Sequence, residues 1–133
     1  MGTFVAGPIS DAASDSGTAR PRDLVHQPEM FGQWGKPMRP AEGIAVEDAR
    51  FVAASVQHWV ANAIREEVAT RRTNLASLLE TLSVKSPELT FHRAVSLQHG
   101  DEPIQLVDLL VWASNFESVR KILVSSLGDD SRA

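Results

Sequence analysis

The sequence predicts an all-α fold. From Val46 to Gly128, apolar residues recur at spacings of three and four, which is the period of an amphipathic helix. No stretch alternates apolar and polar residues long enough to indicate a strand, and no repeat of 20 to 50 residues is visible. With 133 residues, 43% of them hydrophobic, the chain is long enough for one domain with its own core.

The first 43 residues differ in composition from the rest. They hold six of the eight glycines and five of the seven prolines, which disfavour regular elements. We therefore expect residues 1–43 to form an N-terminal arm that is flexible and largely disordered, above all up to residue 29. Residues 31–40 include Phe31, Trp34 and Met38, and we expect this part to dock on another surface.

Residues 44–128 are expected to form the helical domain, with 129–133 as a C-terminal tail. Its first helix is long, with acidic Glu47 and Asp48 in the first turn and Arg71 and Arg72 near the last, a charge order that opposes the helix dipole. Its apolar stripe comprises Val52, Val56, Trp59, Val60, Ala63, Ile64 and Val68.

Two shorter helices are expected next. One spans about residues 74–82, with Thr73 or Asn74 as its N-cap. The other is predicted to start with Ser86 as N-cap and Pro87 at the first helical position, and to stop at Gly100. The helix expected over about residues 74–82 should bury Leu75, Leu78, Leu79 and Leu82.

After Pro103 the pattern indicates two helices, or one helix bent near residues 114–115. Each half has an apolar stripe that we expect to face the core or a partner. The stripes are Leu106, Leu109, Leu110 and Ala113, then Phe116, Val119, Ile122, Leu123 and Leu127.

Several classes of function are disfavoured. The absence of cysteine excludes disulfides, thiolate zinc sites and a cysteine nucleophile. His58 has no serine and acid grouped with it, and His92 and His99 lack further ligands for a metal ion, so we expect neither an enzyme nor a cofactor. No apolar run approaches the roughly 20 residues of a membrane helix, and a cytoplasmic protein is expected.

The charge of the chain is unevenly distributed. The net charge is −4 at a pI of about 5.5, yet the acidic residues gather toward the C-terminal third. Residues 71–99 are locally basic, with four Arg or Lys residues against Glu80 and Glu88. The net charge does not indicate nucleic-acid binding, because a domain that neutralises phosphates usually carries a basic excess, and only this middle region is locally basic.

The order of the helices resembles a helix-turn-helix domain, and particular residues resemble the Cro/cI-type (XRE-like) repressor family over residues 50–125. In that family the first helix of the motif ends in a glycine-containing tight turn, whereas the segment from Glu80 to Lys85 is about three residues longer here. The resemblance rests on Leu75-Ala76, Leu78-Leu79, Ser86, Leu89, Arg93, Val95, Gly100, Leu106, Leu109, Leu110 and Ala113.

The resemblance implies a phage or bacterial repressor that binds double-stranded DNA and acts by occupying an operator. The helix expected from Ser86 would read the major groove, with Arg93 contacting guanine, Thr90 a thymine methyl and Glu88 cytosine. The residues expected to read bases are Glu88, Thr90, His92, Arg93 and Ser96. The residues expected to contact phosphates are Arg71, Arg72, Thr73, Lys85 and Ser86.

Two further expectations concern the arm and the partners. Arg20, Arg22, Lys36 and Arg39 are candidate arm contacts to DNA, an ordinary solvated tail being the alternative. A homodimer is expected if the operator is palindromic, with the last helix as a candidate interface. The rival hypothesis is a non-catalytic helical adaptor that binds a protein partner through its acidic surface and the aromatic arm around Trp34.

Overall fold

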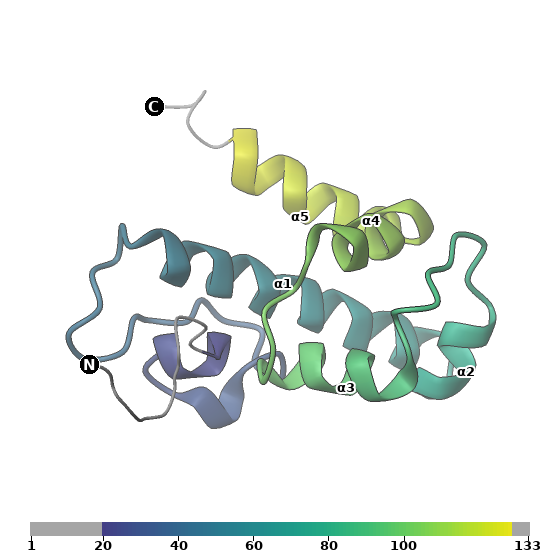
Figure 1. Ribbon diagram of the computed structural model, residues 1–133, viewed down its shortest axis with the longest axis horizontal. Helices are drawn as coiled ribbons and strands as arrows, with labels where there is room; N and C mark the ends of the chain where they lie inside the picture. The colour runs from purple at the N-terminus through teal and green to yellow at the C-terminus, as the bar shows by residue number, and fades with distance from the viewer. Residues whose placement is uncertain (1–19, 129–133) are drawn as a thin grey trace, which may run out of the picture.

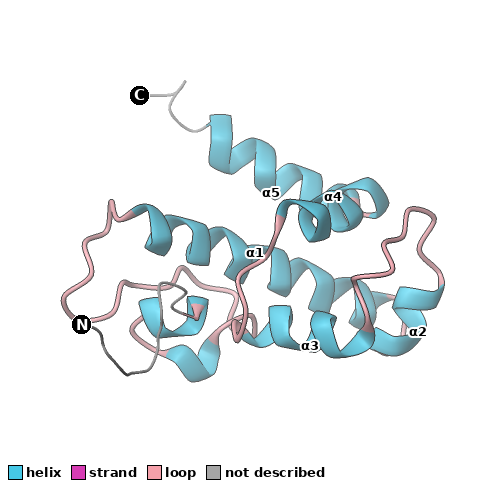
Figure 2. Cartoon of the chain, viewed as in Figure 1, coloured by secondary structure: helices cyan, strands magenta, loops and turns pink. Residues whose placement is uncertain are grey.

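The computed structural model describes residues 20–128, and within that range the regular elements are helices joined by loops (Figures 1 and 2). The only β pairing among these residues is an isolated bridge between Val25 and Pro40, so the all-α class is confirmed. No helix in this range is long and apolar enough to cross a membrane. The helices are α1 (Ala49–Thr70), α2 (Leu75–Glu80), α3 (Phe91–His99), α4 (Leu106–Asn115) and α5 (Glu117–Gly128), preceded by the 3₁₀ turns η2 (Pro21–Leu24) and η3 (Pro28–Met30).

Helix α1 is the central element, and α3, α5 and η2 all pack against it (Figure 1). It begins later than expected because the side chain of Asp48 accepts a hydrogen bond from the Arg50 amide at 2.8 Å, which makes Asp48 the N-cap. The expected stripe is largely correct, although Val52 near the start is exposed. The helix is buried on two sides, so its inner face is wider than the stripe predicted.

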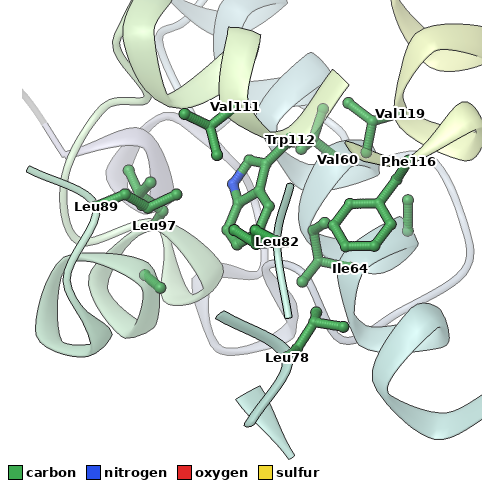
Figure 3. Close-up of a cluster of buried hydrophobic side chains, with 12 residues drawn as sticks. Val60, Ile64, Leu78, Leu82, Leu89, Leu97, Val111, Trp112, Phe116 and Val119 are labelled. Atoms are coloured by element: carbon green, nitrogen blue, oxygen red, sulfur yellow. The ribbon is translucent and has the colours of Figure 1, made fainter. Parts of the chain in front are cut away.

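The main core surrounds Trp112 of α4 (Figure 3). This ring is fully buried and lies 6.1 Å from the ring of Phe116 between centroids. Burial of one such large apolar side chain stabilises the fold by about 1.5–3 kcal/mol. Around it, Figure 3 shows Val60, Ile64, Leu78, Leu82, Leu89, Leu97, Val111 and Val119, which come from all five helices and from the α2–α3 loop.

The start of α3 was predicted wrongly. Thr90, not Ser86, is the N-cap, because its hydroxyl accepts the hydrogen bond of the Arg93 amide at 3.2 Å. The Ser86 hydroxyl accepts from the Glu88 amide, and the turn that follows carries Leu89 into the core. Ser86 and Thr90 can both act as an N-cap. The helix starts after Thr90 because the turn before it buries Leu89 in the core. The predicted stop at Gly100 is confirmed by its left-handed backbone, with φ of 73°.

The C-terminal region forms two helices, as the sequence indicated, with the break at Phe116. The stripe expected on α4 is only half correct, because Leu109 and Ala113 pack against the main core but Leu106 and Leu110 do not. Leu106 is 72% exposed and Leu110 55% exposed, whereas Asp108, Val111 and Trp112 are buried. Because α4 is apolar on most of its circumference, hydrophobic periodicity could not identify its inner face.

The arm is ordered over its described part, which corrects the expectation of disorder for residues 20–43. Leu24, Val25, Phe31 and Met38 form a second apolar cluster against Phe51 and Ala54 of α1. The expected docking of residues 31–40 is therefore observed, and residues 1–19 lie outside the described range. The arm is held to the domain by separate buried side chains and not by a repeating apolar stripe. Its sequence therefore has no helical periodicity.

His58 of α1 is the main polar anchor of the arm. Its Nδ1 accepts a hydrogen bond from the Gly32 amide at 2.9 Å, and its Nε2 lies 3.0 Å from the Lys36 carbonyl oxygen. These partners require the tautomer with the proton on Nε2. The ring is fully buried, and this burial lowers its pKa below the ordinary 6.5, with the nearby Arg65 charge adding to the effect.

Acid should therefore weaken the fold through His58. Protonation of Nδ1 would place an N–H against the Gly32 N–H, so the unfolded chain takes up the proton more readily than the folded one. The free energy of unfolding should be undiminished above pH 6.5 and should fall as the pH is lowered through and below that value. Denaturant unfolding followed by circular dichroism from pH 8 to 5 measures this, and His58→Gln should flatten the profile between pH 7 and 5.5. The exposed His92 provides the control: His92→Gln should keep the wild-type slope, and an unchanged slope in His58→Gln would contradict the assignment.

Gly32 offers a second test of the arm's docking. Its φ is +71°, and an added Cβ would lie 2.4 Å from the Gln98 carbonyl oxygen and 2.9 Å from the Ala61 Cβ. Gly32→Ala should lower the free energy of unfolding by about 2–4 kcal/mol, from backbone strain and steric clash together. Gly43 has a φ of +82° with open space around it, so Gly43→Ala should cost only about 1 kcal/mol. Equal losses in the two variants, measured by urea unfolding, would argue against close docking of the arm.

Candidate nucleic-acid interface

The C-terminal end of α1, helix α2 and the start of α3 gather at one end of the molecule, on the right in Figure 1. Four residues join α1 to α2, and the Asn74 side chain caps α2 by accepting from the Ser77 amide at 2.9 Å. Helices α2 and α3 are in contact, but residues 81–90 separate them. This connection is longer than the turn of three or four residues that joins the helices of a standard helix-turn-helix.

Asn115 of α4 holds the long connection in place. Its Oδ1 accepts hydrogen bonds from the Ser83 amide at 2.7 Å and the Val84 amide at 3.3 Å, and its Nδ2 donates to the Val84 carbonyl at 2.8 Å. The loop is therefore tied to the body of the domain from a helix about 30 residues away in sequence. As a result, α3 starts from a loop that is held in a fixed position on the domain.

Helix α3 presents a narrow exposed side. Ala94 and Leu97 are buried in the main core, while Phe91, His92 and His99 are exposed. Of the five residues predicted to read bases, Glu88, Thr90 and His92 lie on the accessible surface at or before the first turn. Ser96 is buried, which removes it from this set.

Arg93 is also removed from that set, because its guanidinium points into the protein. Nη2 donates to Oδ2 of Asp108 at 2.6 Å and to the Pro103 carbonyl at 3.2 Å, and Nη1 donates to Glu102. The side chain is 20% exposed and that of Asp108 only 2%. The hydrogen bond to Asp108 is the main cause of a raised pKa for Arg93, so this residue carries a fixed, neutralised charge. The guanine contact expected of Arg93 does not fit this geometry.

The ion pair of Arg93 sits within a larger polar junction between α1, α3 and α4. Asp108 Oδ2 also accepts from the Gln105 amide at 2.9 Å and thereby caps α4. Buried Gln57 of α1 donates to the carbonyls of Leu97 and Glu102, at 3.0 and 2.9 Å, and accepts from the Ile104 amide. These bonds satisfy the buried polar groups of the α3–α4 loop and fix α3 on its neighbours.

The residues predicted to contact phosphates divide into two groups. Arg71 pairs with Glu67 at 3.2 Å and lies over the Phe116 ring, while Thr73 and Ser86 are half-buried. Arg72 and Lys85 are exposed, and neither forms an ion pair with another described residue. Of the residues predicted to contact phosphates, these two are the cations without an ion pair in the described range, and Lys85 Nζ donates a hydrogen bond to the Glu80 carbonyl at 3.3 Å.

Arg72 has an unusual backbone. With φ of 53°, it is the one described non-glycine residue with a positive φ. The Thr73 amide donates to the Val68 carbonyl at 3.1 Å and the Arg72 amide to that of Ala69 at 3.1 Å, a helix-ending motif in which glycine is normally found at this position. A side chain in this conformation costs roughly 1–2 kcal/mol. Strain of this kind commonly marks a functional residue.

Most of the basic residues of the arm have partners within the protein. Arg20 pairs with Asp23 through two hydrogen bonds of 3.0 Å, and Arg22 pairs with Asp101 at 3.0 Å. Lys36 lies over the Trp34 ring, 5.7 Å from its centre, and only Arg39 of the four is exposed without such a partner among the described residues. The proposed arm contacts of Arg20 and Arg22 are therefore engaged within the protein.

The candidate interface expected on the last helix is also largely internal. Phe116 and Val119 are buried in the main core, and Ile122 and Leu123 are half-buried. The apolar residues of α5 that remain exposed are Val124 and Leu127. Phe116, Val119 and Ile122 of the predicted stripe therefore belong to the core, whereas Leu127 of the same stripe is 83% exposed.

Comparison of the chain with models of protein families, with characterised proteins and with solved structures gives no match.

Sequence reasoning missed Phe91. It is the first residue of α3 and 52% exposed, but a helix assumed to start at Ser86 placed it in the interior of that helix. The available signal was Thr90, a second cap-forming residue directly before an aromatic side chain. Correct placement of the cap brings Phe91 and His92 to the helix start.

The new role of Arg93 leads to a prediction about stability. Arg93→Ala should lower the free energy of unfolding by about 3 kcal/mol, because it leaves the buried Asp108 carboxylate without its counter-charge. Arg93→Lys should recover only part of this loss, since an ammonium cannot match two carboxylates with a planar fork. Urea unfolding measures both.

A control is available in the exposed pair between Arg50 and Asp48, 2.8 Å apart. Arg50→Ala should lower the free energy of unfolding far less than Arg93→Ala, because an ion pair in contact with water is weak. If Arg93→Ala were equally mild, the ion pair with Asp108 would not hold α3 in place.

Proposed function

We propose that this protein is a sequence-specific double-stranded DNA-binding regulator, which presents the start of α3 to the major groove and the end of α1 to the phosphate backbone. The observation that carries the proposal is Arg72, an exposed arginine kept in a strained left-handed conformation beside the α2–α3 pair. Glycine would relieve that strain. An arginine at a position that favours glycine indicates a use for its side chain, and guanidinium is well suited to bind phosphate.

The surroundings of Arg72 support the same proposal. Lys85 adds a second exposed cation, and the accessible residues Glu88, Thr90 and His92 supply hydrogen-bonding groups of the kind that read base edges. The polar junction around Arg93 provides a rigid base, which a reading helix needs to keep its side chains in register. A protein of this kind would repress by occupying its operator, as the resemblance to the Cro/cI-type family implies.

A protein partner is the second candidate, and Leu106 and Leu110 are the observation in its favour. They lie one turn apart on α4 and are 72% and 55% exposed. The aromatic arm, by contrast, no longer supports the adaptor hypothesis, because Phe31 is buried and Trp34 packs on the arm's own cluster. A second copy of the chain on the α4 face would give the homodimer that a palindromic operator requires.

Selection from a library of random duplexes tests the proposal directly. The protein should enrich one sequence, and binding to that duplex should persist against random competitor and weaken steeply with salt. Equal, weak binding to all duplexes, or none, would overturn the proposal. In that case the exposed leucines of α4 become the first place to look for a partner protein.

Arg72 gives a prediction in which stability and binding move in opposite directions. Arg72→Gly should raise the free energy of unfolding by about 1 kcal/mol, because glycine adopts the positive φ without strain. The same change should weaken binding to the selected duplex and reduce the salt dependence of log K by about one unit of slope.

The matched control removes a positive charge elsewhere. Lys121→Ala on α5, where Lys121 is exposed and pairs loosely with Glu117, should leave both the affinity and the salt slope nearly unchanged. If Arg72→Gly behaves like this control in DNA binding, Arg72 does not contact phosphate.

A further inference from the structure

We propose that Phe91 reads the 5-methyl group of a thymine in the target duplex. This inference rests on the proposed function and adds to it the base that the helix start selects. The Thr90 methyl group is a second candidate for this contact, because only the Thr90 hydroxyl is engaged in capping α3.

The first argument is that the Phe91 ring contributes little to the fold. It is 52% exposed although it stands at the start of a helix whose other large apolar residue, Leu97, is buried. It belongs to neither of the two apolar clusters of the described residues. Stability therefore does not account for an aromatic side chain at this position.

The second argument concerns what surrounds the ring. Few apolar side chains adjoin Phe91 along the chain: residues 85–92 are otherwise polar or charged apart from Pro87 and buried Leu89, and the next apolar residues are Val84, 45% exposed, and half-buried Val95. A protein interface would normally surround such an anchor with further apolar contacts. Because successive helical residues are 100° apart, Phe91 and Arg93 leave α3 about 200° apart, and Arg93 points to α4. Phe91 therefore leaves α3 on the side away from Asp108.

The third argument comes from the chemistry of the groove. Among the major-groove edges of the four base pairs, the thymine methyl is the apolar feature, and phenylalanine is one of the side chains that contact it. The exposed cations Arg72 and Lys85 lie in the connections before and after α2, which reach the same end of the molecule as the start of α3 (Figure 1), together with exposed Glu80 and Glu88. The N-terminus of α3 also directs its positive dipole end toward this side.

The test combines one change in the DNA with one change in the protein. It uses the duplex that the wild-type protein enriches from a random library. Each selected thymine is replaced, one at a time, by deoxyuridine, which lacks only the methyl group. At one position this replacement should weaken wild-type binding about fivefold. Phe91→Ala should bind the thymine duplex about fivefold more weakly and should no longer distinguish it from the deoxyuridine duplex.

Two control variants define the interpretation. His92→Ala should keep the preference for thymine over deoxyuridine even where it lowers affinity, because it leaves the ring in place. Val124→Ala, which removes an exposed apolar side chain on α5, should bind both duplexes as the wild type does. Both variants and Phe91→Ala alter exposed residues, and their unfolding temperatures should match that of the wild type within about 2 °C.

The failures of the two proposals are distinguishable. If no sequence is enriched, the DNA-binding function itself is overturned. If a sequence is enriched but every deoxyuridine substitution affects the wild type and Phe91→Ala equally, the function stands and the role of Phe91 is overturned. If Phe91→Ala binds DNA as the wild type does, the ring lies away from the duplex and a protein partner for it becomes the better explanation.

Discussion

The buried carboxylate of Asp108 is the constraint on which the arrangement of the helices depends. An ionised group with 2% of its side chain exposed needs a counter-charge, and Arg93 of α3 supplies it. The same carboxylate caps α4, so one group fixes the start of α4 and the roll of α3 about its axis. With α3 fixed in this way, Ala94 and Leu97 face the core, and Phe91 and His92 are left at the surface.

The arm completes this frame at the other end of α3. The Arg22 amide donates to the Gly100 carbonyl at 3.0 Å, and the Phe31 ring packs directly on Gly100, where α3 ends. Through His58 and Gly32 the arm is also fastened to α1. The domain therefore holds α3 from both ends, by an ion pair near its start and by the arm at its stop. The elements that position the candidate interface are thus mostly remote from it in sequence.

The sequence was sufficient to predict the fold class, the long helix, the short helix capped by Asn74 and the break near residue 115, because local periodicity and capping residues determine these features. The sequence was insufficient where a contact with another element determines the position of a side chain. Arg93 looks like a free base-reading side chain until α4 brings Asp108 to it from 15 residues away. The arm looks disordered because its anchors, such as His58, belong to another element. Leu106 and Leu110 look buried because their spacing is helical, and periodicity does not say which side of an apolar helix faces inward.

The account places DNA binding at the end of the molecule where the strained Arg72 and the start of α3 lie. Chemical-shift changes of the backbone amides on adding the selected duplex test this most directly, because they report the contact surface residue by residue. The account predicts that the largest changes cluster at residues 71–73 and 85–92, with little change in α5 or in the arm. Changes centred on Leu106 to Leu110 of α4, or on residues 20–43, would contradict it.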